Sequence, residues 1–76
     1  MDEIQYCVAL FDSTTHAVHA ERICRKANID VRLLPVPRQL SSNCGICMRF
    51  FIQDKQSVEE KLKENNAEFV SIVELE

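Results

Sequence analysis

The sequence predicts an α+β fold, because four short apolar runs of strand length alternate with two helical patterns. Their order is strand, helix, strand, strand, helix, strand, which is the order of the ferredoxin-like βαββαβ unit. Its four-stranded antiparallel sheet would carry both helices on one face. With 76 residues, 46% of them hydrophobic, the chain is expected to form a single domain over residues 1–76 with a small core.

The first half of the chain supplies a strand, a helix and a second strand. Residues 4–11 form an apolar run, and the polar residues 12–15 offer N-caps for the helix that follows. Asn28 is expected to end this helix in a left-handed conformation. Residues 31–36 predict the second strand, and Pro35 places it at a sheet edge because proline cannot donate to a ladder. The apolar side of the helix consists of Ala17, Ala20, Ile23, Cys24 and Ala27.

The second half supplies the remaining strands and helix. Residues 46–52 alternate in the manner of a half-buried strand. Asp54 is the predicted cap of the second helix, Asn65 and Asn66 close it, and residues 69–75 form the last strand. Right-handed crossovers would place the first and third strands centrally and the others at the edges. The core-facing positions of the third strand are expected to be Ile46, Met48, Phe50 and Ile52.

Charge and hydropathy exclude several classes of partner. The net charge is −3 and the basic residues are scattered, so no nucleic acid is expected as a partner. Apolar runs are short and broken by charges, so no membrane association is expected. The acidic start Met1-Asp2-Glu3 is unlike a secretory signal, which favours a soluble, cytoplasmic protein with its four cysteines reduced.

The segment from Pro35 to Cys47 carries the strongest chemical signal. A thiolate is a good nucleophile when positive charge, a helix dipole or donated hydrogen bonds lower its pKa. Near Cys44 the segment offers a cation in Arg38 and hydroxyls in Ser41 and Ser42. Gly45 would permit a positive φ and a close approach of backbone or substrate.

The predicted topology adds a second part to this candidate site. The end of the first strand, the start of the first helix and the connection between the second and third strands all fall at one end of the sheet. Cys44 is therefore expected near Thr14, Thr15 and His16, where unsatisfied helix N–H groups favour an anion. Ser13 belongs to the same helix start.

The other cysteines have simpler interpretations. Cys7 in the first strand and Cys24 in the first helix are expected to pack as small hydrophobic residues. Cys47 completes a C-x-x-C with Cys44, but strand alternation turns it away from Ile46. A redox dithiol is therefore possible but not favoured. Zinc binding stays open as an alternative, through His16, His19, Cys44 and Cys47, and would give stoichiometric metal in the purified protein.

The sheet face without helices is a candidate interface. An apolar patch on a small domain tends to mark one, and a second copy in a homodimer or a docking enzyme could cover it. The residues expected on this face are Cys7, Ala9, Phe11, Cys47 and Phe51.

The chain resembles the Se/S carrier protein-like family of small bacterial proteins along essentially its whole length. The most specific part is Pro35-x-Pro37-Arg38 followed by Ser41-Ser42-x-Cys44-Gly45, supported by the run from Phe11 to Ala17. Cys47 is not part of the family pattern, which weakens the dithiol and zinc interpretations. The residues that the resemblance marks are Ser13, Thr14, His16, Pro35, Pro37, Arg38, Ser41, Ser42, Cys44 and Gly45.

The resemblance implies a carrier more than a stand-alone enzyme. Cys44 would hold a persulfide or selenosulfide, take it from a cysteine desulfurase-like donor and pass it to an acceptor protein, with no cofactor and no metal. The alternative is a non-catalytic module in which the same loop and helix start bind a small anionic ligand for regulation. A Cys44 pKa near the ordinary value of about 8.5 would favour that module.

Overall fold

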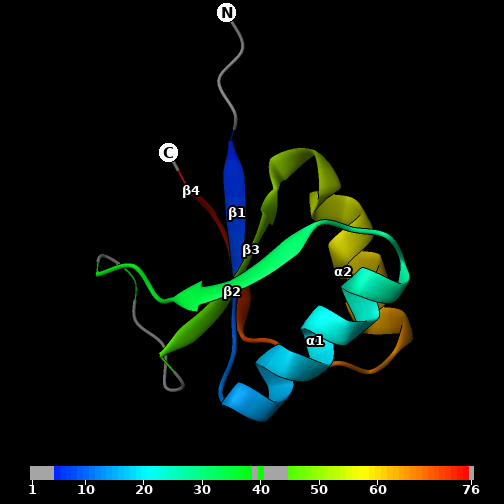
Figure 1. Ribbon diagram of the computed structural model, residues 1–76, viewed down its shortest axis with the longest axis horizontal. Coiled ribbons are helices and arrows are strands. Elements are labelled where there is room, and N and C mark those ends of the chain that lie inside the picture. The colour runs from blue at the N-terminus through cyan, green and yellow to red at the C-terminus, as the bar shows by residue number, and fades with distance from the viewer. Residues whose placement is uncertain (1–4, 39, 41–44, 76) are drawn as a thin grey trace, which may run out of the picture.

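The computed structural model describes residues 5–38, 40 and 45–75, and its elements follow the predicted order (Figure 1). The elements are β1 (Tyr6–Leu10), α1 (Thr14–Lys26), β2 (Val31–Pro35), β3 (Ile46–Phe51), the short 3-10 helix η1 (Ile52–Asp54), α2 (Lys55–Glu64) and β4 (Ser71–Leu75).

The four strands form one antiparallel sheet in the order β2-β3-β1-β4, with both helices on one side of it (Figure 1). The first and third strands are central, as predicted. Pro35 is the last residue of the edge strand β2, opposite Ile46. The α+β, ferredoxin-like fold class is thereby confirmed.

The ends of the helices are set largely as the sequence predicts. Ser13 is the N-cap of α1, and its Oγ accepts a hydrogen bond from the His16 backbone N–H at 3.2 Å. Asn28 and Asn66 adopt left-handed conformations just after the helices, with φ of 62° and 54°. Asparagine tolerates this conformation better than most residues, so both helices end without glycine.

Asp54 occupies the N-cap position of α2, as predicted, but without the usual geometry of an N-cap. η1 leads directly into the helix, and Asp54 has φ −95° and ψ 4° instead of the extended conformation of most N-caps. Its side chain makes no capping hydrogen bond. The chain enters α2 through a tighter turn, which the residues from Ile52 onward form in place of a last stretch of strand.

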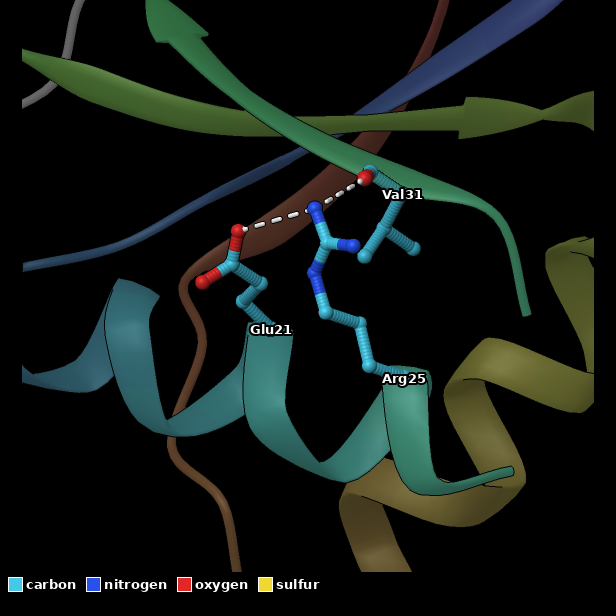
Figure 2. Close-up of polar contacts among 3 residues, drawn as sticks. All are labelled: Glu21, Arg25 and Val31. Carbon is cyan, nitrogen blue, oxygen red and sulfur yellow. Dashed lines mark hydrogen bonds and ion pairs between the residues drawn. The ribbon is translucent and has the colours of Figure 1, made fainter. Parts of the chain in front are cut away.

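An arginine joins the end of α1 to the start of β2. One Nη of Arg25 donates to Glu21 Oε2 at 3.3 Å and to the carbonyl oxygen of Val31 at 3.2 Å (Figure 2). A guanidinium is suited to this double role because it presents several donors in one plane. The contact orients α1 against the edge strand.

The main core lies between the helices and the sheet. Residues from β1, β3, α1 and α2 meet there, and the predicted core side of β3 is confirmed. Buried members include Met48 and Phe50, with Ile46 and Ile52 packed against them. The other buried members are Cys7, Ala9, Phe11, Ala17, Ala20, Cys24, Val31, Val58, Leu62 and Ala67.

A second apolar cluster lies on the other side of the sheet, which we call the open face. Its buried members are Val8, Leu10 and Cys47. The partly buried residues Leu34, Val36, Leu40, Val73 and Leu75 pack against them. Val36 and Leu40 belong to the connection between β2 and β3, so this connection is anchored on the open face.

The prediction for the composition of the open face is partly wrong. Cys7 and Ala9 pair with Phe50 and Met48 and lie in the helix-side core, as does Phe11. Every residue from Cys7 to Phe11 is buried, because apolar side chains pack against the central strand β1 on both faces of the sheet. Such a strand has no polar alternation from which its two sides could be told apart.

No helix among the described residues is long and apolar enough to cross a membrane.

Candidate functional site

The strand register places the candidate segments at one end of the sheet. Leu10 pairs with Cys47 on one side and with Ser71 on the other, and Cys47 also pairs with Leu34. The end of β1, the end of β2 and the starts of β3 and β4 therefore lie in one row. The start of α1 follows β1 directly at this end (Figure 1).

The β2–β3 connection is held by two backbone hydrogen bonds. Val36 N–H donates to the carbonyl oxygen of Gly45 at 3.0 Å, one step beyond the last ladder pair of β2 and β3. Leu40 N–H donates to the carbonyl oxygen of Pro37 at 3.0 Å, which closes a four-residue turn. Arg38 lies in this turn and is exposed.

Gly45 adopts the positive φ that glycine permits. Its φ is 71°, and a Cβ built on it would meet no atom within 4 Å. Glycine is therefore required by backbone conformation and not by crowding, since L-residues pay a steric cost in this region. The described chain leaves the space above Gly45 open.

The start of α1 presents N–H groups without competing negative charge in its own first turn. That turn carries no acidic residue, and Thr14 and Thr15 are exposed. The first N–H groups of any helix lack intrahelical acceptors, and Ser13 satisfies one of them through its hydrogen bond to His16 N–H. This end of α1 is polar, exposed and partly positive.

His16 has an acidic neighbour that the sequence does not indicate. Its Nε2 lies 3.4 Å from Glu68 Oε2, beside a hollow of about 270 Å³ that Asp12 and Phe69 also line. The chain returns to this end of the sheet before β4, since Val70 N–H donates to the carbonyl oxygen of Leu10 at 2.7 Å. Glu68 therefore competes with any bound anion for a protonated His16.

Three of the four cysteines are inaccessible to solvent. Cys7, Cys24 and Cys47 are each 0% exposed. Burial raises the pKa of the Cys24 thiol to about 11. Burial, and then the charge of Glu74, raise the pKa of the Cys7 thiol. Both stay protonated near neutral pH, which confirms their interpretation as packing residues and makes them poor nucleophiles.

Cys47 packs as part of the open face. Its Sγ donates a long hydrogen bond to the carbonyl oxygen of Pro35 at 3.9 Å, within the second apolar cluster. The predicted turn of this side chain away from Ile46 is confirmed, since Ile46 packs on the helix side. Cys47 is thereby part of the sheet packing and is sealed from solvent.

The proposed zinc ligands are divided by the sheet. His19 is exposed on α1 and lines a hollow of about 470 Å³ between the helices, together with Arg22 and Lys61. Cys47 lies on the opposite side of the sheet. A single metal ion cannot reach both side chains, so the four-ligand set is wrong as a unit.

The remaining predicted site residues fall into two parts. Ser13, Thr14 and His16 belong to the helix side, whereas the turn that carries Arg38 is anchored on the open face through Val36 and Leu40. Within the described chain, no hydrogen bond or ion pair joins the two parts. Ser41, Ser42 and Cys44 lie outside the described residues.

These observations define a class of protein: a small α+β domain with three sealed cysteines and a polar end of the sheet that adjoins a cysteine-containing loop. A family model described as Putative Se/S carrier protein-like matches residues 6–74, and the chain belongs to this family. No curated protein and no solved structure gives a significant match.

Proposed function

We propose that this protein is a sulfur or selenium carrier that acts through Cys44. The observation that carries the proposal is the burial of the other three cysteines in a chain of this family. A carrier needs one accessible thiol, and Cys44 is the remaining candidate. We further propose that the protein works in the cytoplasm, where thiols are kept reduced.

The transfer step needs neither a metal nor a redox cofactor. The Cys44 thiolate attacks the outer sulfur of a persulfide on a cysteine desulfurase-like donor, and the donor's S–S bond breaks as a new S–S bond forms on Cys44. The donor leaves as a thiolate. An acceptor thiolate or other nucleophile then takes the outer sulfur and returns Cys44 to a thiolate, and selenium follows the same route.

Residues at the same end of the sheet are proposed to stabilise the anionic sulfur. Arg38 is exposed and, within the described chain, has no ion-pair partner, so its guanidinium is available to an anion. The N–H groups of Thr14 and the first turn of α1 add partial positive charge. His16 is proposed to contribute less, because Glu68 competes with the sulfur anion for a protonated imidazole. Gly45, Ser41 and Ser42 are proposed to let the donor's sulfur approach.

Incubation with a cysteine desulfurase and cysteine tests the proposal. Intact mass spectrometry should show a gain of one sulfur atom on the wild type, and mapping of alkylated peptides should place that sulfur on Cys44. Cys44→Ser should show no gain. Cys47→Ala is the matched control, because it removes the neighbouring cysteine of the same C-x-x-C and should still be loaded. An unmodified wild type, or equal loading of Cys44→Ser, would contradict the proposal.

The same experiment separates the carrier from an anion-binding regulatory module. The module would leave the protein unloaded, and Cys44 would titrate near the ordinary thiol pKa of about 8.5. The carrier requires a lower value, because only the thiolate attacks the donor at neutral pH. Iodoacetamide reactivity of Cys44 against pH, measured by peptide mapping, distinguishes the two.

A further inference from the structure

The open face carries a compact group of aromatic and cationic side chains at the end of the sheet away from Cys47. Tyr6 and Phe51 are cross-strand partners whose rings stack with centroids 5.3 Å apart. The guanidinium carbon of Arg49 lies over the Tyr6 ring, 4.4 Å from its centroid. Arg32 is directly opposite Arg49 in the β2–β3 ladder. We call these four residues the Tyr6–Arg49 cluster.

The two arginines are an unfavourable pair for the isolated domain. Like charges directly opposite each other on a sheet face destabilise it. Among the described residues, no carboxylate lies within ion-pair distance of Arg32 or Arg49. Asp30 lines the same shallow hollow but pairs with neither. A bound carboxylate would remove the repulsion and use both guanidinium groups.

Among the described residues, no strand residue on this side of the sheet is acidic, although the chain has 12 acidic and 9 basic residues. Glu74 of β4 pairs with Cys7, faces the helix side and binds Lys55 Nζ at 3.2 Å. The strand positions that face the open side are Tyr6, Val8, Leu10, Arg32, Leu34, Cys47, Arg49, Phe51, Ser71, Val73 and Leu75.

From this charge distribution we infer that the Tyr6–Arg49 cluster docks an acidic segment of a partner protein, whose carboxylates bind Arg32 and Arg49. Arginine and aromatic residues are the types enriched at the centres of protein interfaces. The inference stands independently of sulfur transfer, because it concerns only this face.

Other occupants fit the face less well. The hollow at the cluster holds about 20 Å³, whereas small-molecule pockets typically have about 300 to 1,000 Å³. A nucleic acid would meet a chain of net charge −3 with only two cations at this site. A symmetric homodimer through the open face would bring the arginines toward a second copy of the same face, on which no described strand residue is acidic.

Tyr6 provides a direct readout, since the chain has one tyrosine and no tryptophan. Titration of the full chain with a blocked hexaglutamate peptide at low salt should give a saturable change in tyrosine fluorescence. A hexaglutamine peptide should give none. Arg32→Gln and Arg49→Gln should each weaken binding about two- to fivefold, the range for an exposed ion pair. Arg22→Gln is the matched control, because it removes an equal charge from an exposed position on α1 and should bind like the wild type.

The urea concentration at which the Arg32 variant unfolds distinguishes a docking role of this residue from a structural one. Arg32→Gln should unfold at the same or a higher urea concentration than the wild type, since it removes a like-charge contact. A lower midpoint would make Arg32 a structural residue and overturn the inference. So would an unchanged Tyr6 signal, or equal weakening by Arg22→Gln.

Two further outcomes would assign the face to another occupant and also overturn the inference. Tighter binding of a short oligothymidylate, lost in Arg32→Gln, would identify a nucleic-acid site. Self-association in analytical ultracentrifugation that disappears in the same variant would identify a homodimer. Sulfur loading of Cys44 should be unchanged in Arg32→Gln under excess donor, so failure here is distinct from failure of the carrier proposal.

Discussion

At the scale of single residues, the three cysteines that the structure describes, Cys7, Cys24 and Cys47, are all buried. The pKa values of Cys7 and Cys24 are raised chiefly because burial disfavours their thiolates. Their positions in an apolar strand and on the apolar side of a helix predict this burial. The contact between His16 and Glu68 could not be predicted, because a single exposed acid in a loop carries no pattern.

Cys24 should make the stability of the protein decrease at high pH. Burial raises its pKa to about 11 in the folded protein, against a reference value of 9.0. The protonated thiol therefore contributes fully to the free energy of unfolding below about pH 9, and this contribution is lost as the pH rises toward 11. At pH 10.5 the loss is about 2 kcal/mol, since each pKa unit corresponds to about 1.4 kcal/mol. Urea unfolding of wild type and Cys24→Ala at pH 8 and 10.5 checks this.

The comparison with Cys24→Ala cancels the titration of groups common to both proteins. The alanine variant is less stable at pH 8 because it loses packed sulfur, and the difference between the two proteins should narrow at pH 10.5. A difference that stays constant with pH would show that Cys24 does not titrate in this range.

At the scale of secondary-structure elements, caps and turns followed local sequence rules in most places. Asn28 and Asn66 end their helices as predicted, and Ser13 caps α1. Asp54 occupies the N-cap position of α2 but makes no capping hydrogen bond, because η1 ends at this residue and its backbone is not extended. Propensity alone cannot distinguish a cap from the last residue of a 3-10 turn.

Ser13→Ala should destabilise the protein by about 1 kcal/mol, because the His16 N–H loses its side-chain acceptor. Ser13→Asn, which retains a capping oxygen, should recover most of that loss. Thr14→Ala is the neighbouring control and should change stability by less than about 0.5 kcal/mol, as expected for an exposed position. Urea unfolding midpoints at neutral pH provide the measurement, and an equal effect of both alanine variants would contradict the assignment of Ser13 as cap.

At the scale of the whole molecule, strand order was predictable and the two sides of β1 were not. Crossover handedness and Pro35 were enough to place β1 and β3 centrally. The apolar run of β1 is buried on both faces, so its sequence does not show which residues meet the helices. The candidate site was predictable as an end of the sheet, since that follows from topology.

Leu62 tests the helix-side core as the main source of stability. It is 0% exposed on α2, and Leu62→Ala should lower the free energy of unfolding by about 2 to 5 kcal/mol. Lys63→Ala, at the adjacent exposed position, should have little effect. Urea unfolding of both variants can be followed by circular dichroism. A decrease in the free energy of unfolding below about 1 kcal/mol for Leu62→Ala would show that this core is not the main source of stability.

The three buried thiols also allow local unfolding of the native protein to be measured. Cys7, Cys24 and Cys47 lie on β1, α1 and β3 and are each 0% exposed. An alkylating reagent can reach each one only when its element opens, so the labelling rate at each position measures the free energy of that opening. Mass spectrometry of the wild-type chain would then show whether a central strand, a helix and its partner strand open together or separately.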